Sequence, residues 1–244
     1  MRLIKFVIQY DGTHYYGWQR QIITPTIQQI LEDTLRKITN KDVKIKGSGR
    51  TDRGVHALGQ VAHCRVETSL DDPTLLNAAN ALLPNDILIK ELKTETDSFD
   101  AQRNVYSKIY FYQILNTPFP DPMLRHYSWW LPKALDQEAM NETASKIVGE
   151  YDFSAFRNQG NSVKTTVRKI YRSRFFAEHP YLIYEIEGGG FLKQMVRNLV
   201  STFVRVGRGQ MTLAQFEELL ASGDRTQAPP PAPPQGLFLK SVTY

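Results

Sequence analysis

The sequence YSKIYFYQIL, residues 106–115, predicts a β-strand. This strand begins the second of two successive β-α-β-β-α-β units that the chain is expected to form. Alternation along it predicts that Tyr106, Tyr110 and Tyr112 share one face. The elements expected after it are a helix opening at 135–136, a hairpin of strands 166–176 and 181–187, a helix over 191–206, a short helix opened by a capping box at 212–215, and a final strand 237–244.

The residues before this strand predict the same order. The expected strands are 3–10, 43–46, 60–66 and 87–92. Helices are expected to start at Thr24-Pro25, with Thr24 as N-cap, and at Asp72-Pro73. Two successive units of this order predict an α+β fold of two ferredoxin-like (RRM-like) halves, residues 1–103 and 104–244, whose mainly antiparallel sheets join around a central cleft.

Composition narrows the class of protein. The 244 residues are 41% hydrophobic and 23% charged, which is typical of a globular chain and not of a disordered one. A single cysteine, Cys64, excludes an internal disulfide and is expected to be a buried structural thiol. His56 and His63 are expected in core or surface roles. No apolar run reaches the roughly 18 residues of a membrane span. We therefore expect a soluble, cytoplasmic protein with no membrane or metal partner.

The placement of charge is more informative than its total of +5. Three segments are rich in basic residues and poor in acids: 44–53, 164–176 and 193–208. Each one alone could be an ordinary solvated face. Together with an aromatic content of 11%, they favour a nucleic-acid partner.

The densest candidate site is GSGRTDRGVHALGQ, residues 47–60. Its four glycines allow tight turns, and Asp52 lies two residues after Arg50 and directly before Arg53. The flanking guanidinium groups are expected to favour the ionised carboxylate of Asp52, which can serve as a nucleophile or as a base. A surface Arg–Asp pair in a glycine-rich turn is the alternative that spacing leaves open.

Two further features offer contacts to RNA. The tyrosine face of strand 106–115 could stack a base, although sheet packing explains any single tyrosine. The helix expected after Gly190 carries a face of residues four apart: Lys193, Arg197, Ser201 and Arg205. This basic stripe could contact phosphates or the Asp52 carboxylate, or it could be solvated surface charge.

In this order the segments resemble the TruA family of tRNA pseudouridine synthases over nearly the full length of the chain. The matching segments are YDGTHYYGWQRQ (10–21), GRTDRGVHALGQV (49–61), SKIYFYQILN (107–116), YDFSAF (151–156), MVRNLV (195–200) and DRT…GLFLKSVTY (224–244). The GRTDRGVH block carries most of the specificity, because the other segments are weak signals alone.

The resemblance implies an enzyme that isomerises uridine to pseudouridine at positions 38, 39 and 40 in the anticodon arm of tRNA. It also implies activity without cofactor or metal, usually as a homodimer, on a uridine flipped out of its stack. The residues that match the family's catalytic positions are Asp52 (the nucleophile), Arg50, Tyr110 and Arg197.

Each matched residue has an expected role. Asp52 attacks either C6 of the base or C1′ of the sugar, which the sequence leaves open. Tyr110 stacks on the flipped base or helps to remove the C5 proton. Arg50 orients Asp52 or fills the gap left by the base, and Arg197 stabilises the ionised carboxylate. The side chains expected to bind tRNA are Tyr110, Arg50, Arg53, Arg168, Lys169, Arg172 and Lys193.

One departure from the family pattern affects an expected RNA contact. Relatives read Phe-x-Ala-Arg before the tyrosine strand, whereas this chain has Gln102 in the arginine position and Arg103 one place later. Two rival functions are a non-catalytic RNA-binding protein of two RRM-like halves and a synthase acting on another RNA or on other uridines. The first leaves the Arg50–Asp52 pair without a role.

Overall fold

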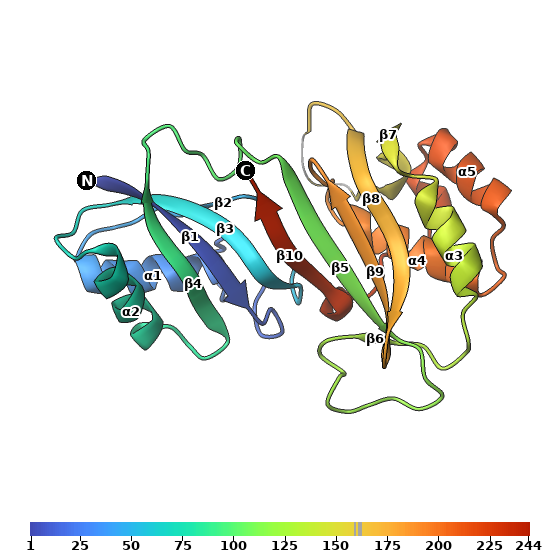
Figure 1. Ribbon diagram of the computed structural model, residues 1–244, viewed down its shortest axis with the longest axis horizontal. Helices are drawn as coiled ribbons and strands as arrows, with labels where there is room; N and C mark the ends of the chain where they lie inside the picture. The colour runs from blue at the N-terminus through green and yellow to red at the C-terminus, as the bar shows by residue number, and fades with distance from the viewer. Residues whose placement is uncertain (159, 161–162) are drawn as a thin grey trace. The chain divides into compact units, whose positions relative to one another are not determined.

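The computed structural model describes residues 1–158, 160 and 163–244, which form two compact units (Figure 1). The first unit comprises Met1–Tyr106 and Phe238–Tyr244, and the second comprises Ser107–Leu237. Helices combined with mainly antiparallel strands confirm the predicted α+β class. Within the described ranges, no helix has the length and apolar character needed to cross a membrane, and no three His, Cys, Asp or Glu side chains are grouped as metal ligands.

The first unit has the predicted β-α-β-β-α-β order. Its elements are β1 (Arg2–Tyr10), α1 (Ile27–Thr39), β2 (Lys46–Gly47), β3 (His56–Val66), α2 (Asp72–Leu82) and β4 (Ile87–Glu95). β1 lies between β3 and β4 and is antiparallel to both, while the short β2 pairs with β3. The order β4-β1-β3-β2 is that of a ferredoxin-like sheet.

Alternation along β1 builds the core of this unit. Ile4, Phe6 and Ile8 are buried on one face of the strand. Figure 1 shows α1 passing behind the strands, with α2 beside it. The N-cap of α1 is Thr26, whose side chain accepts from the Gln29 backbone N–H, so the predicted cap at Thr24 is two residues too early.

The second unit begins at the tyrosine strand. Its elements are β5 (Ser107–Leu115), β6 (Trp129–Trp130), α3 (Gln137–Ser145), β7 (Gly149–Asp152), β8 (Val167–Glu178), β9 (Tyr181–Gly188), α4 (Met195–Gly207) and α5 (Leu213–Ser222). β9 lies between β5 and β8, β7 follows β8, and these pairings are all antiparallel. The predicted hairpin of β8 and β9 is confirmed, as is the capping box of Thr212 and Gln215 that opens α5.

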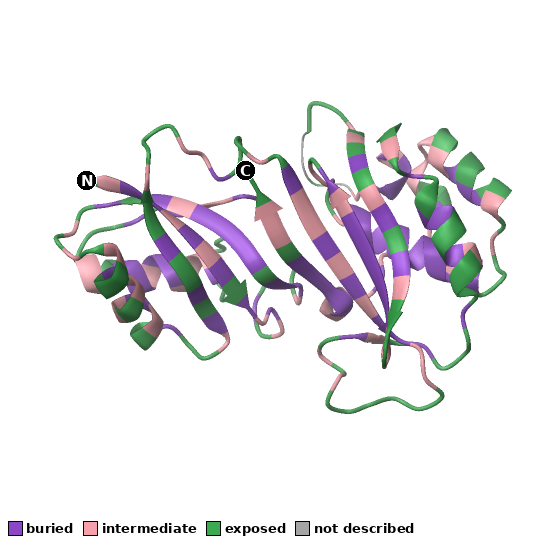
Figure 2. Cartoon of the chain, viewed as in Figure 1, coloured by how far each residue is buried: buried purple, intermediate pink, exposed green. Residues whose placement is uncertain are grey.

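The helix α4 is the centre of this unit, and Figure 2 shows it buried along nearly its whole length. Phe203 on α4 packs against Tyr184 of β9 and Phe216 of α5. The helix begins at Met195, four residues later than the predicted start at 191, because Gln194 before it has a left-handed backbone with φ of 60°.

The last strand, β10 (Leu237–Thr243), has a partner that the sequence does not predict. The sequence places it with residues 104–244, but Phe238 and Leu239 pair in parallel with His56 and Ala57 of β3. The first unit thus contains the end of the chain as well as its beginning. The division at 103–104 and the junction of the sheets around a central cleft stay predictions.

Candidate active site

Asp52 lies in the turn between β2 and β3. Its side chain is half-buried, whereas the neighbouring Thr51 is buried. The Asp52 carbonyl accepts the Val55 backbone N–H at 3.1 Å, which closes the turn. The carboxylate is therefore presented from a short, internally bonded loop.

A second loop, residues 10–18, holds this turn in place. The Trp18 N–H donates to the Thr51 carbonyl at 3.1 Å, and the Gly54 N–H donates to the Tyr15 carbonyl at 3.4 Å. The hydroxyls of Tyr10 and Thr51 lie 2.8 Å apart, and burial raises the pKa of Tyr10 to about 12. Tyr10 therefore stays protonated at neutral pH. We call residues 10–18 the clamp loop.

Two glycines of the clamp loop allow the close approach. A Cβ on Gly12 would lie 2.1 Å from the Val55 carbonyl oxygen, and one on Gly17 would lie 2.5 Å from the Thr51 carbonyl oxygen. Gly17 also has φ of +89°, a conformation that L-residues rarely adopt. The glycines of YDGTHYYGW are thus required by contact with the turn that carries Asp52.

The two histidines occupy the structural roles predicted for them. His56 is buried, stacks on Phe238 with 4.6 Å between ring centroids, and its Nδ1 accepts the Gly12 N–H at 3.0 Å. His63 Nδ1 accepts the Ala101 N–H at 3.1 Å, and burial lowers the pKa of His63. Cys64 is buried as predicted.

The arginines beside Asp52 are both exposed and both contact the clamp loop or the residue that follows it. Arg50 Nε donates to Gln19 Oε1 at 3.0 Å. The Arg53 guanidinium lies 4.2 Å from the centroid of the Tyr16 ring, a cation–π contact. These two side chains place positive charge on the exposed surface around the turn.

In the second unit, Tyr110 is the tyrosine whose surroundings fit a site. It is 8% exposed and meets the Phe191 ring edge-on at a centroid distance of 5.2 Å. Tyr112 is fully buried and donates to the Pro233 carbonyl at 2.8 Å, while Tyr106 lies before β5 and is 63% exposed. The three tyrosines therefore do not form one platform for stacking bases.

Arg197 lies inside the second unit and does not belong to an exposed stripe. It is 8% exposed, and its Nε donates to the Ala232 carbonyl at 2.7 Å. Ser201 is also buried, and Lys193 precedes the helix in an exposed position. The interpretation of this face as solvated charge is wrong at Arg197 and Ser201, because α4 is a core helix.

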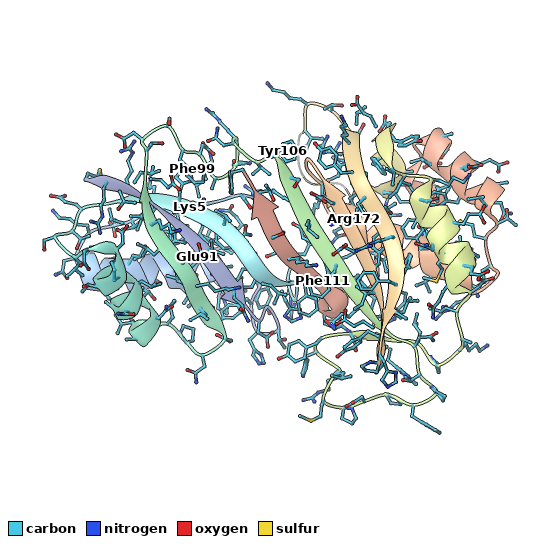
Figure 3. The ribbon with its side chains drawn as sticks, in the orientation of Figure 1. Lys5, Glu91, Phe99, Tyr106, Phe111 and Arg172 are labelled. Carbon is cyan, nitrogen blue, oxygen red and sulfur yellow. The ribbon has the colours of Figure 1, made fainter. Side chains whose placement is uncertain are left out.

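The basic segment of β8 faces acids on the neighbouring strand. Arg172 forms ion pairs of 3.2 Å with both Glu185 and Glu187 of β9, and Arg174 pairs with Glu185 at 3.0 Å. Figure 3 shows the Arg172 side chain lying across β9. Its charge is partly compensated, although residues 164–176 contain no acid.

The other expected tRNA-binding residues of β8 have different surroundings. Arg168 is half-buried and donates from Nη1 to the Thr165 carbonyl at 2.9 Å, while burial lowers its pKa. Lys169 is exposed, with Nζ 5.9 Å from the centroid of the Tyr171 ring. In the first unit, Gln102 and Arg103 are exposed, and both backbone N–H groups donate to Asp100.

Comparison with known proteins identifies the family. The family model described as tRNA pseudouridine synthase matches residues 6–102 and 143–244. The chain belongs to the tRNA pseudouridine synthase family. Proteins named tRNA pseudouridine synthase A from Thermoanaerobacter sp. (strain X514) and Geotalea uraniireducens (strain Rf4) are 40% and 43% identical over 244 residues, which cover 100% of each chain.

The segments that the family model matches contain most of the candidate site residues, but not Tyr110. As a tRNA pseudouridine synthase, the chain isomerises uridine to pseudouridine in tRNA. The matched segments include the clamp loop, Asp52 and Arg197. Tyr110 lies outside them, in the stretch 103–142, although the full-length relatives align across it.

Sequence reasoning misses the residues that hold the proposed catalytic side chains. Gly12, Gly17 and Trp18 fix the Asp52 turn, and Ala232 contacts Arg197. The sequence signals for the first three are two glycines in the loop directly after a strand and the resemblance of YDGTHYYGWQRQ to the TruA family, neither of which shows a contact with Thr51. A single alanine within a proline run is the signal for Ala232.

Proposed function

We propose that this tRNA pseudouridine synthase modifies the uridines at positions 38, 39 and 40 of the anticodon arm, as a cytoplasmic homodimer. The specificity of the GRTDRGVH block for the TruA family supports this choice of positions. The observation that carries the proposal is the half-buried Asp52 carboxylate, held in a turn that the clamp loop bonds at Thr51 and Gly54. A carboxylate fixed in this way is suited to nucleophilic catalysis.

The proposed reaction balances without an external electron donor. The bond between N1 of the base and C1′ of the sugar breaks, the base rotates, and a bond forms between C5 and C1′. A proton then leaves C5, and N1 carries a proton in the product. Because the reaction is an isomerisation, the proposal assigns no cofactor or metal.

The side chains of both units have proposed roles. Asp52 is the nucleophile, with attack at C6 or at C1′ as the two routes open to a carboxylate. Tyr110, with its ring braced by Phe191, contacts the flipped base and assists removal of the C5 proton. Arg197 supplies the permanent positive charge that an ionised nucleophile needs.

The remaining arginines and lysines are proposed to bind the tRNA backbone. Arg50 and Arg53 are exposed beside Asp52, and Lys169 and Lys193 are exposed in the second unit. We assign a smaller contribution to Arg172, because Glu185 and Glu187 already pair with it. Phosphate contacts of this kind give affinity and position without reading sequence.

Mapping of pseudouridine in tRNA tests the proposed positions. Total tRNA is compared from cells with the gene, without it, and without it but supplied with the Asp52→Asn variant. The proposal predicts loss at 38, 39 and 40 in the second and third strains, with other pseudouridines unchanged. Retention at these positions in the deletion strain, or loss at different ones, contradicts it.

A further inference from the structure

The proline-rich segment APPPAPP, residues 228–234, makes a contact that a simple connector does not need. Its Ala232 is 1% exposed and exchanges two hydrogen bonds with Arg197. Arg197 Nε donates to the Ala232 carbonyl at 2.7 Å, and the Ala232 N–H donates to the Arg197 carbonyl at 3.1 Å. One loop residue therefore fixes both the backbone and the guanidinium of Arg197. We call residues 228–234 the strap.

The sequence of the strap is matched to this contact. Residues 229–231 and 233–234 are all proline and have no backbone N–H. Ala232 is consequently the single residue in 229–234 that can donate a backbone hydrogen bond. The proline run is interrupted at the position where a donor is used.

Side chains of the second unit form hydrogen bonds to both ends of the strap. Arg225 donates to the Ala228 carbonyl at 2.9 Å and to Asn198, the neighbour of Arg197 on α4, at 3.0 Å. At the other end, Tyr112 of β5 donates to the Pro233 carbonyl at 2.8 Å. The strap thus joins the arginine helix to the tyrosine strand.

The end of the strap also fits closely against Tyr112. A Cβ on Gly236, two residues beyond the strap, would lie 2.6 Å from the Tyr112 ring, so this position requires glycine. Burial raises the pKa of Tyr112, and the charge of Arg197 opposes that rise. The phenol remains a hydrogen-bond donor to Pro233, and the contact with the strap persists at neutral pH.

We propose that the strap positions the Arg197 guanidinium for the isomerisation, with Ala232 as the positioning residue. An arginine side chain loses much rotational freedom when it is ordered, and prolines limit the freedom of the strap that orders it. The Nε bond sets the direction of the guanidinium before substrate binds, which is preorganisation. This inference rests on the proposed catalytic role of Arg197.

The variant Ala232→Pro tests the strap, because it removes the N–H that reaches Arg197 and crowds the contact. The matched control is Pro230→Ala, at a less buried position of the same strap. Tritium release from tRNA labelled at C5 of uridine gives kcat and KM. We expect kcat of Ala232→Pro to fall about 10- to 100-fold, as for a small misplacement of a catalytic group, with KM changed less than about threefold. Pro230→Ala keeps the Ala232 N–H and four of the five prolines of the strap, so its kcat should stay within about threefold of the wild type.

A double-mutant cycle with Arg197→Lys separates positioning from general damage. Lysine keeps the charge but lacks the Nε donor to Ala232. If the strap acts through Arg197, Ala232→Pro should lower kcat by no more than about twofold in the Arg197→Lys background. An equal loss in both backgrounds overturns the inference. Wild-type kcat in folded Ala232→Pro also overturns it.

The design distinguishes failure of the strap from failure of the proposed role of Arg197. Arg197→Lys with wild-type kcat shows that the charge acts without the Nε bond and overturns the inference alone, whereas wild-type kcat in Arg197→Met removes Arg197 from the mechanism, and the inference with it. Impaired Arg197→Lys together with normal Ala232→Pro overturns the inference alone. If Ala232→Pro does not fold, an amide-to-ester replacement at 232 removes the same N–H with little change of shape. Because the Ala232 carbonyl that accepts from Arg197 Nε remains, a smaller loss of kcat, of about three- to tenfold, is expected. Unchanged kcat in the ester variant is the contrary result.

Discussion

The Asp52 carboxylate lies half-buried in a turn whose neighbours are bonded to the clamp loop. Thr51 and Gly54 accept or donate these bonds through the backbone, so the turn is held whatever side chain stands at 52. At the scale of single residues, the position of the turn therefore depends on backbone contacts, and its chemistry depends on the side chain at 52. Substitutions at the clamp should move the carboxylate, and substitutions at 52 should remove it.

Gly17→Ala should displace the turn. A methyl group 2.5 Å from the Thr51 carbonyl oxygen cannot be accommodated without a shift, and φ of +89° adds strain. We expect kcat for tRNA isomerisation to fall about 10- to 100-fold, with a loss of stability of roughly 1–3 kcal/mol by urea denaturation.

Gly209→Ala is the matched control for backbone strain. Gly209 also has a positive φ, of +67°, but nothing lies within 4 Å of its Cβ position. It should lose stability, by about 1 kcal/mol, and keep wild-type kcat. Equal kcat losses at positions 17 and 209 would show that strain alone accounts for the effect.

Tyr110→Phe keeps the ring that packs against Phe191 and removes only the hydroxyl. If the hydroxyl assists proton removal at C5, kcat should fall about 100-fold or more while the Kd for tRNA changes little. Tritium release and filter binding measure the two quantities. Unchanged kcat would leave Tyr110 with a stacking role only.

Lys108 on β5 gives a pH-dependent prediction for stability. It is half-buried, and burial lowers its pKa to about 8, from roughly 10.4 in an unfolded chain. Between these values the unfolded state binds more protons, so stability should rise with pH from about 8 towards 10. Urea denaturation at pH 7.5 and 9.5 should show this rise in the wild type but not in Lys108→Met. The same rise of stability with pH in wild type and Lys108→Met would show that Lys108 is not its cause.

At the scale of elements, local patterns predict where helices and strands occur better than where they begin. Alternation of apolar and polar residues predicts β1 and β5, and the capping box predicts the start of α5. The start of α4 is missed because a left-handed Gln194 ends the preceding loop, and nothing in its side chain signals that conformation. The Asn158 side-chain amide donates to the Gln194 side-chain carbonyl, a tertiary contact that local propensity does not contain.

The face of a strand is predictable, but the depth of burial along it is not. Tyr110 and Tyr112 do share a face of β5, as alternation predicts. Whether each one contacts ligand or core depends on the strap and on Phe191, which are distant in sequence. For the same reason, the charge of β8 could not be judged from its own residues, because the paired acids lie on β9.

Charge pairing within the sheet leads to a prediction about tRNA binding. Arg168→Glu/Lys169→Glu should weaken binding and lower the slope of log Kd against log salt by up to about 0.7–0.9 for each phosphate that is no longer neutralised. Arg172→Gln should change the slope less, because its charge is already paired, but should lower stability by leaving Glu187 without this partner. A larger slope change for Arg172→Gln than for the double variant would contradict this ranking.

At the scale of the whole molecule, the order of elements is predictable and the partner of the last strand is not. The β-α-β-β-α-β order follows from periodicity, which is a local property. The pairing of β10 with β3 joins residues near 238 to residues near 56, and only long-range hydrogen bonds determine it. That pairing also places Phe238 on the ring of His56, inside the GRTDRGVH block.

The net charge of +5 does not show which basic side chains a polyanion can reach, because some of them are buried or paired in the folded chain. Arg197 is inside the second unit, Arg172 is paired with acids, and Arg50 and Arg53 remain exposed beside Asp52. The surface available to a polyanion is therefore smaller than the three basic segments suggest. It includes the turn at which we propose the reaction starts.

The most direct test of the proposed role of Asp52 is tritium release by purified wild-type protein and Asp52→Asn on tRNA labelled at C5 of uridine. Asparagine has nearly the same shape as aspartate but is a poor nucleophile. We expect release by the wild type, at least about a thousandfold slower release by Asp52→Asn, and a Kd for tRNA within about threefold of wild type. Wild-type release by Asp52→Asn would contradict the central role of the aspartate.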